Sequence, residues 1–152
     1  MPAQLTFGGE ETFSVSPERL FAALTDLDQL GKTIPDLVSS EKTSDQTLHC
    51  VVRPGFSFLR GTLRLAITIV DLDAPKSASM RIAADGIGAH INIESRLQIN
   101  PTEGGCKLTW TAAVMELKGL VATISRGLIS AAAERTIKNA WARVHAELDA
   151  TP

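Results

Sequence analysis

The chain closes with the stretch LKGLVATISRGLISAAAERTIKNAWARVHAEL, residues 117–148, and this stretch decides the fold. Apolar side chains recur in it at the spacing of an amphipathic helix, which predicts a helix of about 30 residues and roughly 45 Å. The apolar positions form two stripes: Leu117, Val121, Ile124 and Leu128, then Ile137, Trp141, Val144 and Leu148. A helix of this length needs a broad apolar partner surface, which the preceding residues must supply.

The two stripes are out of phase near Gly127 and the small residues 130–133, where we expect a bend or a close approach to a sheet. We expect Leu120 to Leu128 to form a lid over a cavity. The part from Ile137 to Leu148 is expected to pack more firmly.

Strands are predicted between Val38 and Glu116, because apolar side chains recur there at every second position. Turn-forming residues separate these runs at 44–46, 54–55, 73–76, 85–88 and 101–105. Connections this short favour antiparallel neighbours, since a parallel crossover needs a dozen or more residues. This part of the chain therefore predicts a meander of strands.

The N-terminal segment predicts a strand from Gln4 to Val15, in which Gly8-Gly9 allows a bend or bulge. A helix follows from Ser16-Pro17-Glu18, because serine caps free backbone N–H groups and proline suits the first helical position. A second short helix is expected to run from Asp26 or Asp28 to Thr33. The whole pattern predicts an α+β protein of one domain, residues 1–152, with a six- to seven-stranded curved antiparallel sheet wrapped around a long C-terminal helix.

The composition and charge of the chain argue against several classes of protein. The 152 residues carry a formal net charge of −2 with mixed signs, which argues against a nucleic-acid partner. The first residues lack the basic and apolar regions of a signal peptide, and no apolar run is long enough for a transmembrane segment. Cys50 and Cys106 are predicted to be reduced core residues, so we expect a cytoplasmic protein for which peripheral membrane contact remains open.

The polar residues do not predict catalysis. His49, His90 and His145 lie far apart without metal-ligand spacing, and we interpret each as a surface residue. Gly86-Ile87-Gly88 falls at a hairpin, where it does not form a phosphate-binding loop. We therefore expect no catalytic residue, no metal and no cofactor.

Strand parity predicts an apolar concave face, which ordinary core packing explains for each residue taken alone and which, taken together, could line a hydrophobic cavity under the last helix. Its expected aliphatic and aromatic lining comes from the sheet at Leu63, Leu65, Ile67, Met80, Ile82, Ile91, Ile93, Trp110 and Val114, and from the helix at Leu120, Ile124 and Leu128. Ser95 falls on the same parity and is the one polar candidate for orienting a ligand. Phe56 and Phe58, beside Pro54-Gly55, fit the mouth of the cavity and local packing equally well.

The order of elements and several short motifs resemble those of a known family. The matching residues are FGGEETF (7–13), SPERLF (16–21), LTD (24–26), IP (34–35), RG (60–61), DLDAP (71–75), GIG (86–88) and LTWTA (108–112). With them the chain resembles a START-like, helix-grip protein of the SRPBCC superfamily, and more narrowly the carbon monoxide dehydrogenase G-subunit family.

The resemblance implies a deep, largely apolar cavity between the sheet and the last helix. It implies a lipid- or quinone-like ligand, and an accessory or maturation role for a redox enzyme, a molybdenum-dependent carbon monoxide dehydrogenase. The chain stops at Pro152 without the apolar tail of longer members, which argues against a membrane anchor. Two alternatives stay open: a cyclase- or hydrolase-type enzyme using a cavity-facing polar residue, and an interaction module with a filled core.

Overall fold

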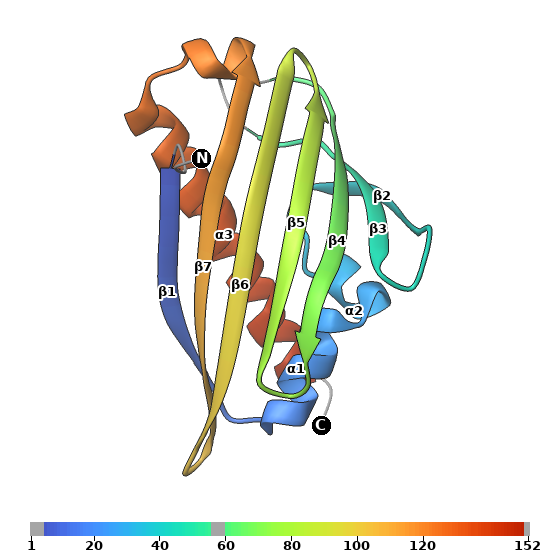
Figure 1. Cartoon of the computed structure of the whole chain (residues 1–152), viewed down its shortest axis with the longest axis vertical. Coiled ribbons are helices and arrows are strands. Elements are labelled where there is room, and N and C mark those ends of the chain that lie inside the picture. Colours follow the sequence, from blue (N-terminus) through green and yellow to red (C-terminus); the bar gives the residue numbers. More distant parts are fainter. Residues whose placement is uncertain (1–4, 56–59, 151–152) are drawn as a thin grey trace.

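The computed structural model describes residues 5–55 and 60–150, and its elements follow the predicted order (Figure 1). They are β1 (Leu5–Phe13), α1 (Pro17–Thr25), α2 (Leu27–Gly31), β2 (Leu37–Lys42), β3 (Thr47–Val52), β4 (Leu63–Asp73), β5 (Ser77–Gly86), β6 (Ala89–Thr102), β7 (Gly105–Gly119), the short 3-10 helix η1 (Leu120–Thr123) and α3 (Arg126–Ala150). The strands form one seven-stranded sheet in the order β1-β7-β6-β5-β4-β3-β2. Every neighbouring pair is antiparallel, which confirms the predicted meander.

The sheet curves around α3, which crosses one of its faces diagonally, while α1 and α2 lie at one end (Figure 1). The first strand, β1, pairs with the last strand, β7, so the N-terminal segment forms an edge of the sheet beside α3. Among the residues that the structure describes, no helix is long and apolar enough to cross a membrane.

Capping residues fix the two short helices as the sequence predicts. Ser16 Oγ accepts a hydrogen bond from the backbone N–H of Arg19 at 3.2 Å, and Pro17 occupies the first helical position. Asp26 Oδ1 accepts from the backbone N–H of Asp28 at 3.0 Å and starts α2. The apolar face of α1 is buried against the sheet, which sets the position of both helices.

The prediction that the last helix starts at Leu117 is wrong, because β7 continues through Leu117 to Gly119. Leu117 pairs with Ile91 of β6, and this ladder satisfies its backbone groups. Gly119 ends the strand: its φ is +85°, and a Cβ there would lie 2.0 Å from the carbonyl oxygen of Gly88. The chain then turns through η1, and α3 begins at Arg126.

This boundary explains why the two apolar stripes are out of phase. Ile124 is extended, with φ −85° and ψ 146°, so the first stripe does not belong to the helix that carries the second. From Arg126 onward α3 is one helix through Gly127 and residues 130–133.

Of the bend or bulge that Gly8-Gly9 allows, no bulge forms, since β1 pairs with β7 without a register shift. A Cβ at Gly9 would lie 3.2 Å from Nε1 of Trp110, so this glycine leaves room for an indole ring. The strand ends at Phe13, short of the expected Val15. A register shift occurs instead between β6 and β7, where Asn92 pairs with Glu116 and the next residue, Ile93, pairs with Val114.

The main core cluster lies between α1, the C-terminal part of α3 and the adjacent end of the sheet. Its buried members are Phe13, Leu20, Phe21, Ala23, Leu24, Ala78, Leu97, Ile99, Cys106, Leu108, Val144 and Leu148. Burying this many apolar groups, at about 25 cal/mol per Å² removed from water, fixes the C-terminal part of the helix on the sheet.

Candidate functional site

The inner face of the sheet, which faces α3, gathers the residues that strand parity predicts for a cavity. Cross-strand pairing aligns Ile67, Ile82, Ile93 and Val114 in one row across four strands. A second row aligns Leu65, Ala84 and Ile91, and a third aligns Met80, Ser95 and Ala112. The predicted lining of β4, β5, β6 and β7 therefore shares one continuous surface.

Burial varies across this inner face. Leu63, Ile67, Met80 and Val114 are buried, whereas Leu65, Ile82, Ile91, Ile93, Ser95 and Trp110 are half-buried. Of the half-buried residues, Leu65, Ile82, Ile91 and Trp110 also pack against buried clusters. Besides the main core there are two further clusters, one around Ile67 and Met80 under α2 and one around Leu63 and Val121 under η1. The half-buried apolar side chains therefore remain partly accessible to solvent, although α3 crosses this face of the sheet.

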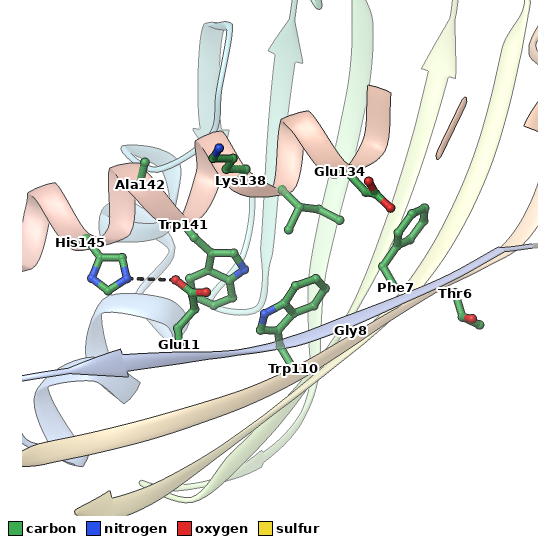
Figure 2. Close-up of a pocket in the computed structure, with 11 residues that line it drawn as sticks. Thr6, Phe7, Gly8, Glu11, Trp110, Glu134, Lys138, Trp141, Ala142 and His145 are labelled. Atoms are coloured by element: carbon green, nitrogen blue, oxygen red, sulfur yellow. Dashed lines mark hydrogen bonds and ion pairs between the residues drawn. The ribbon is translucent and has the colours of Figure 1, made fainter. Parts of the chain in front are cut away.

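A groove of about 720 Å³ runs along α3, between this helix and the strands β1 and β7 (Figure 2). Its lining residues are Thr6, Phe7, Gly8 and Glu11 of β1, Trp110 of β7, and Glu134, Ile137, Lys138, Trp141, Ala142 and His145 of α3. Trp110 belongs both to this groove and to the inner parity of the sheet. A groove of this volume is large enough for an organic molecule of moderate size.

The indole rings of Trp110 and Trp141 form an aromatic floor in the groove, and Trp141 also lies near Phe13, which is buried in the main core. The ring centroids of Trp110 and Trp141 lie 6.1 Å apart, and those of Trp141 and Phe13 lie 6.4 Å apart. These are the two tryptophans of the whole chain, in which aromatic residues make up 5% of the composition. Trp110 Nε1 is buried without a hydrogen-bond partner in the described part of the chain, so the floor holds one unused donor.

Charged groups lie along the whole groove, with Glu11 and His145 at one end, Glu134 at the other end and Lys138 between them (Figure 2). Glu11 Oε1 and His145 Nε2 are 3.0 Å apart and join β1 to α3 (Figure 2). The imidazole of His145 stacks on the ring of Phe13 with centroids 4.2 Å apart. Glu134 and Lys138 complete the polar lining, so the groove combines an aromatic floor with charged edges.

His145 differs from the surface residue that the sequence suggests, because it is half-buried and bonded to Glu11. His49 is exposed, as expected. His90 lies on the other face of the sheet, hydrogen-bonded through Nδ1 to Asp85 and 3.7 Å from Glu116 Oε1. The Lys118 ammonium, and then the Asn92 amide, hold the pKa of the Glu116 carboxyl below its ordinary value.

Two predicted lid residues do not cover the inner face. Leu120 is 65% exposed and lies in η1, and Leu128 is 45% exposed in the first turns of α3. Ile124 is half-buried and packs against the cluster around Leu63. Phe56 and Phe58 lie outside the described residues.

In the stripe from Ile137 to Leu148, where firm packing is expected, Val144 and Leu148 are buried in the main core, and the half-buried Trp141 packs against it. Ile137 is half-buried and lines the groove, which Trp141 lines as well. Cys50 and Cys106 are buried free thiols, as predicted, and burial raises the pKa of both. Within residues 5–55 and 60–150, no three His, Cys, Asp or Glu side chains are placed to hold a metal ion.

Sequence reasoning missed the contribution of β1 to the groove. Phe7, Glu11 and Phe13 share the inner parity of this strand, and a carboxylate at Glu11 on that parity is the signal that could have indicated a site. The two glycines and the adjacent Glu10 obscure this alternation. The contribution of α3 was hidden because Ile137 and Trp141 continue the stripe of Val144 and Leu148 and match ordinary core packing.

A curved seven-stranded sheet around a C-terminal helix, with two short helices after the first strand, defines a START-like helix-grip domain. The chain superposes on a conserved protein from Geobacillus kaustophilus with a TM-score of 0.89, at 21% identity over 97% of each chain. A START superfamily protein from Mycobacterium smegmatis gives a TM-score of 0.71 at 10% identity, over 97% of this chain and 98% of that one. The protein Ara h 8.0201 also gives 0.71, at 14% identity over 97% and 99%.

The family assignment comes from the sequence. The model of the CoxG family, named for the G subunit of carbon monoxide dehydrogenase, matches residues 9–149, and the chain belongs to this family. No protein of curated function matches the chain.

Proposed function

We propose that the protein binds a hydrophobic small molecule, lipid- or quinone-like, between the inner face of the sheet and α3. The observation that carries this proposal is the set of half-buried apolar side chains on that face, next to a groove of about 720 Å³. A face covered by a helix is normally closed by close packing, so accessible apolar area there favours a ligand.

Binding would draw its free energy from apolar burial, at about 25 cal/mol per Å², with a few polar groups fixing orientation. Ser95 is half-buried on the inner face, between Met80 and Ala112 in the cross-strand row. The Trp110 indole N–H lacks an acceptor and would gain one from an oxygen-bearing ligand that displaces the ring slightly.

The family name suggests a partner enzyme for the proposed ligand binding. The name refers to carbon monoxide dehydrogenase, so we propose that the bound molecule serves a molybdenum-dependent enzyme of that kind, with this chain as its accessory or maturation protein. Co-purification of the chain with such an enzyme from the native source tests this partner. Ligand binding without any such association would remove the partner and leave the binding proposal intact.

The two tryptophans make the binding test direct, because both line the groove and report on its occupancy. We expect an alkylated benzoquinone to quench tryptophan fluorescence in a saturable way, with a dissociation constant in the micromolar range, as burial of about 300 Å² of apolar surface supports. Native mass spectrometry of protein from its source, followed by organic extraction, would identify the natural ligand.

A pair of matched variants locates the site. Ala112→Phe adds a ring on the inner parity of β7 and should weaken quenching at least about tenfold, whereas Thr111→Phe adds the same ring at the exposed neighbouring position and should leave it unchanged. Circular dichroism checks that both variants fold. If neither the quinone nor oleate binds the parent protein, its interior is filled and a surface interaction module is the better description.

A further inference from the structure

Glu11 of β1 and His145 of α3 form a hydrogen-bonded pair at one end of the groove, with Glu11 Oε1 and His145 Nε2 3.0 Å apart. Because an ionised carboxylate only accepts hydrogen bonds, His145 Nε2 must carry the hydrogen of this contact. The imidazole also stacks on the ring of Phe13, which fixes its plane. The pair therefore holds the Glu11 carboxylate in one orientation.

The second oxygen of the Glu11 carboxylate is left for the groove. Figure 2 shows it turned away from His145, toward the rings of Trp110 and Trp141. Within residues 5–55 and 60–150, the only side-chain partner of Glu11 is His145. The Glu11 side chain is 28% exposed, so a molecule in the groove can reach this oxygen. It is a charged acceptor, and such acceptors form the stronger hydrogen bonds.

A donor lies on the same side of the groove. The indole N–H of Trp110 is buried without a partner in the described part of the chain. A Cβ at Gly9, which pairs with Trp110 across the ladder, would lie 3.2 Å from this nitrogen. Gly9 precedes Glu11 by two residues, so both lie on one face of β1. An acceptor and a donor therefore flank the same part of the groove.

This combination selects the head group of a ligand. A hydroxyl donates one hydrogen bond and accepts others, so it can use both the Glu11 oxygen and the indole N–H after a small shift of the ring. A quinone carbonyl or an ether oxygen only accepts, which leaves Glu11 without a donor. A carboxylate head would be repelled by the like charge of Glu11.

We propose that the groove selects ligands whose aromatic ring carries a hydroxyl, bound between Glu11 and Trp110 with the apolar tail running toward Phe7. This inference rests on the proposed function, because it names the chemical class of the molecule bound at that site: an alkylated phenol in preference to an ether, a quinone or a carboxylate. The ring of such a molecule suits the floor formed by Trp110 and Trp141. Figure 2 shows Phe7 at the end of the groove opposite His145.

The test is isothermal titration calorimetry of the full chain with para-pentylphenol and para-pentylanisole, which differ only by a methyl group on the oxygen. We expect the phenol to bind at least about tenfold more tightly, because a hydrogen bond to a charged group outweighs the apolar area of one methyl group. Equal affinities, or tighter binding of the anisole, would overturn the proposal.

Matched variants assign the preference to Glu11. Glu11→Gln keeps an oxygen for the His145 N–H but offers an amide N–H to the groove, a donor that serves phenol and ether oxygens alike. It should lower the phenol affinity about tenfold and leave the anisole affinity unchanged. Glu10→Gln, on the other face of β1 and paired with Lys107, should keep the full preference. If the preference survives Glu11→Gln, or if Glu134→Gln removes it instead, the hydroxyl does not bind at Glu11.

Urea denaturation and quinone quenching separate the possible outcomes. A pair that only ties β1 to α3 predicts that Glu11→Gln shifts the urea midpoint and leaves the phenol preference intact. A parent protein that binds both probes equally, or binds the benzoquinone but neither probe, refutes the hydroxyl selection alone. One that binds neither probe, nor the benzoquinone, nor oleate refutes the proposed function itself.

Discussion

Trp110 connects strand parity with the candidate site more directly than any other residue. Its alternation in β7 predicts an inward side chain, and the structure places it against Trp141 at a centroid distance of 6.1 Å. What parity cannot show is the neighbour across the ladder, Gly9, whose missing side chain makes room for the indole. A buried donor without a partner costs about 1–3 kcal/mol, a cost that a ligand acceptor would relieve.

The two thiols lead to a prediction at the same scale. Burial raises the pKa of Cys50 and Cys106, and reaction requires an exposed thiolate. In the native protein at pH 8 we expect both to react with a disulfide reagent at roughly 10⁻³ or less of their rate in denaturant, because reaction must wait for opening. Absorbance of the released thiolate measures this. Rapid modification of one thiol without denaturant would show that its strand opens locally, and Cys50→Ala would identify which.

At the scale of elements, the sequence predicted the capped short helices and the meander, because both depend on local signals. Ser16, Pro17 and Asp26 act within one helical turn, and alternation fixes which face of a strand is buried. The start of the last helix was wrong because Leu117 fits both a helical stripe and the parity of β7. Its pairing with Ile91 decides between them, and that contact is distant in sequence.

The candidate site was predicted in part for the same reason. Inner-face residues of four strands follow from parity alone, as Ile82 and Ile93 do. The groove depends on how far α3 stands from β1, a distance that no local pattern encodes. Glu11 and His145, which are 3.0 Å apart in space, therefore gave no joint signal in the sequence.

The boundary between β7 and α3 can be tested with two glycines. Gly119→Ala should lower the free energy of unfolding by at least about 2 kcal/mol, since left-handed backbone and a Cβ 2.0 Å from Gly88 O both oppose the change. Gly127→Ala, where a Cβ meets nothing within 4 Å, should raise it by about 0.5 kcal/mol. Urea denaturation measures both values. Equal tolerance of the two changes would mean that the chain does not turn at Gly119.

At the scale of the whole molecule, α3 is attached to the sheet at both ends and open in between. Val144 and Leu148 hold the C-terminal part in the main core, while Ile129 packs near the start of the helix. The groove and the half-buried inner face lie along the intervening part. The main-core packing and the groove therefore lie on largely different turns of one helix, with Trp141 shared between them.

This division predicts that the two properties can be changed separately. Val144 is 4% exposed in the main core, so Val144→Ala should lower the free energy of unfolding by about 2 kcal/mol and leave quinone quenching unchanged. Ile137 is half-buried and lines the groove, so Ile137→Ala should cost about 1 kcal/mol or less and weaken quenching about tenfold. Urea denaturation and fluorescence titration on the same samples give both quantities. If Ile137→Ala destabilises the protein as much as Val144→Ala and leaves quenching intact, the middle of α3 is ordinary core and the ligand lies elsewhere.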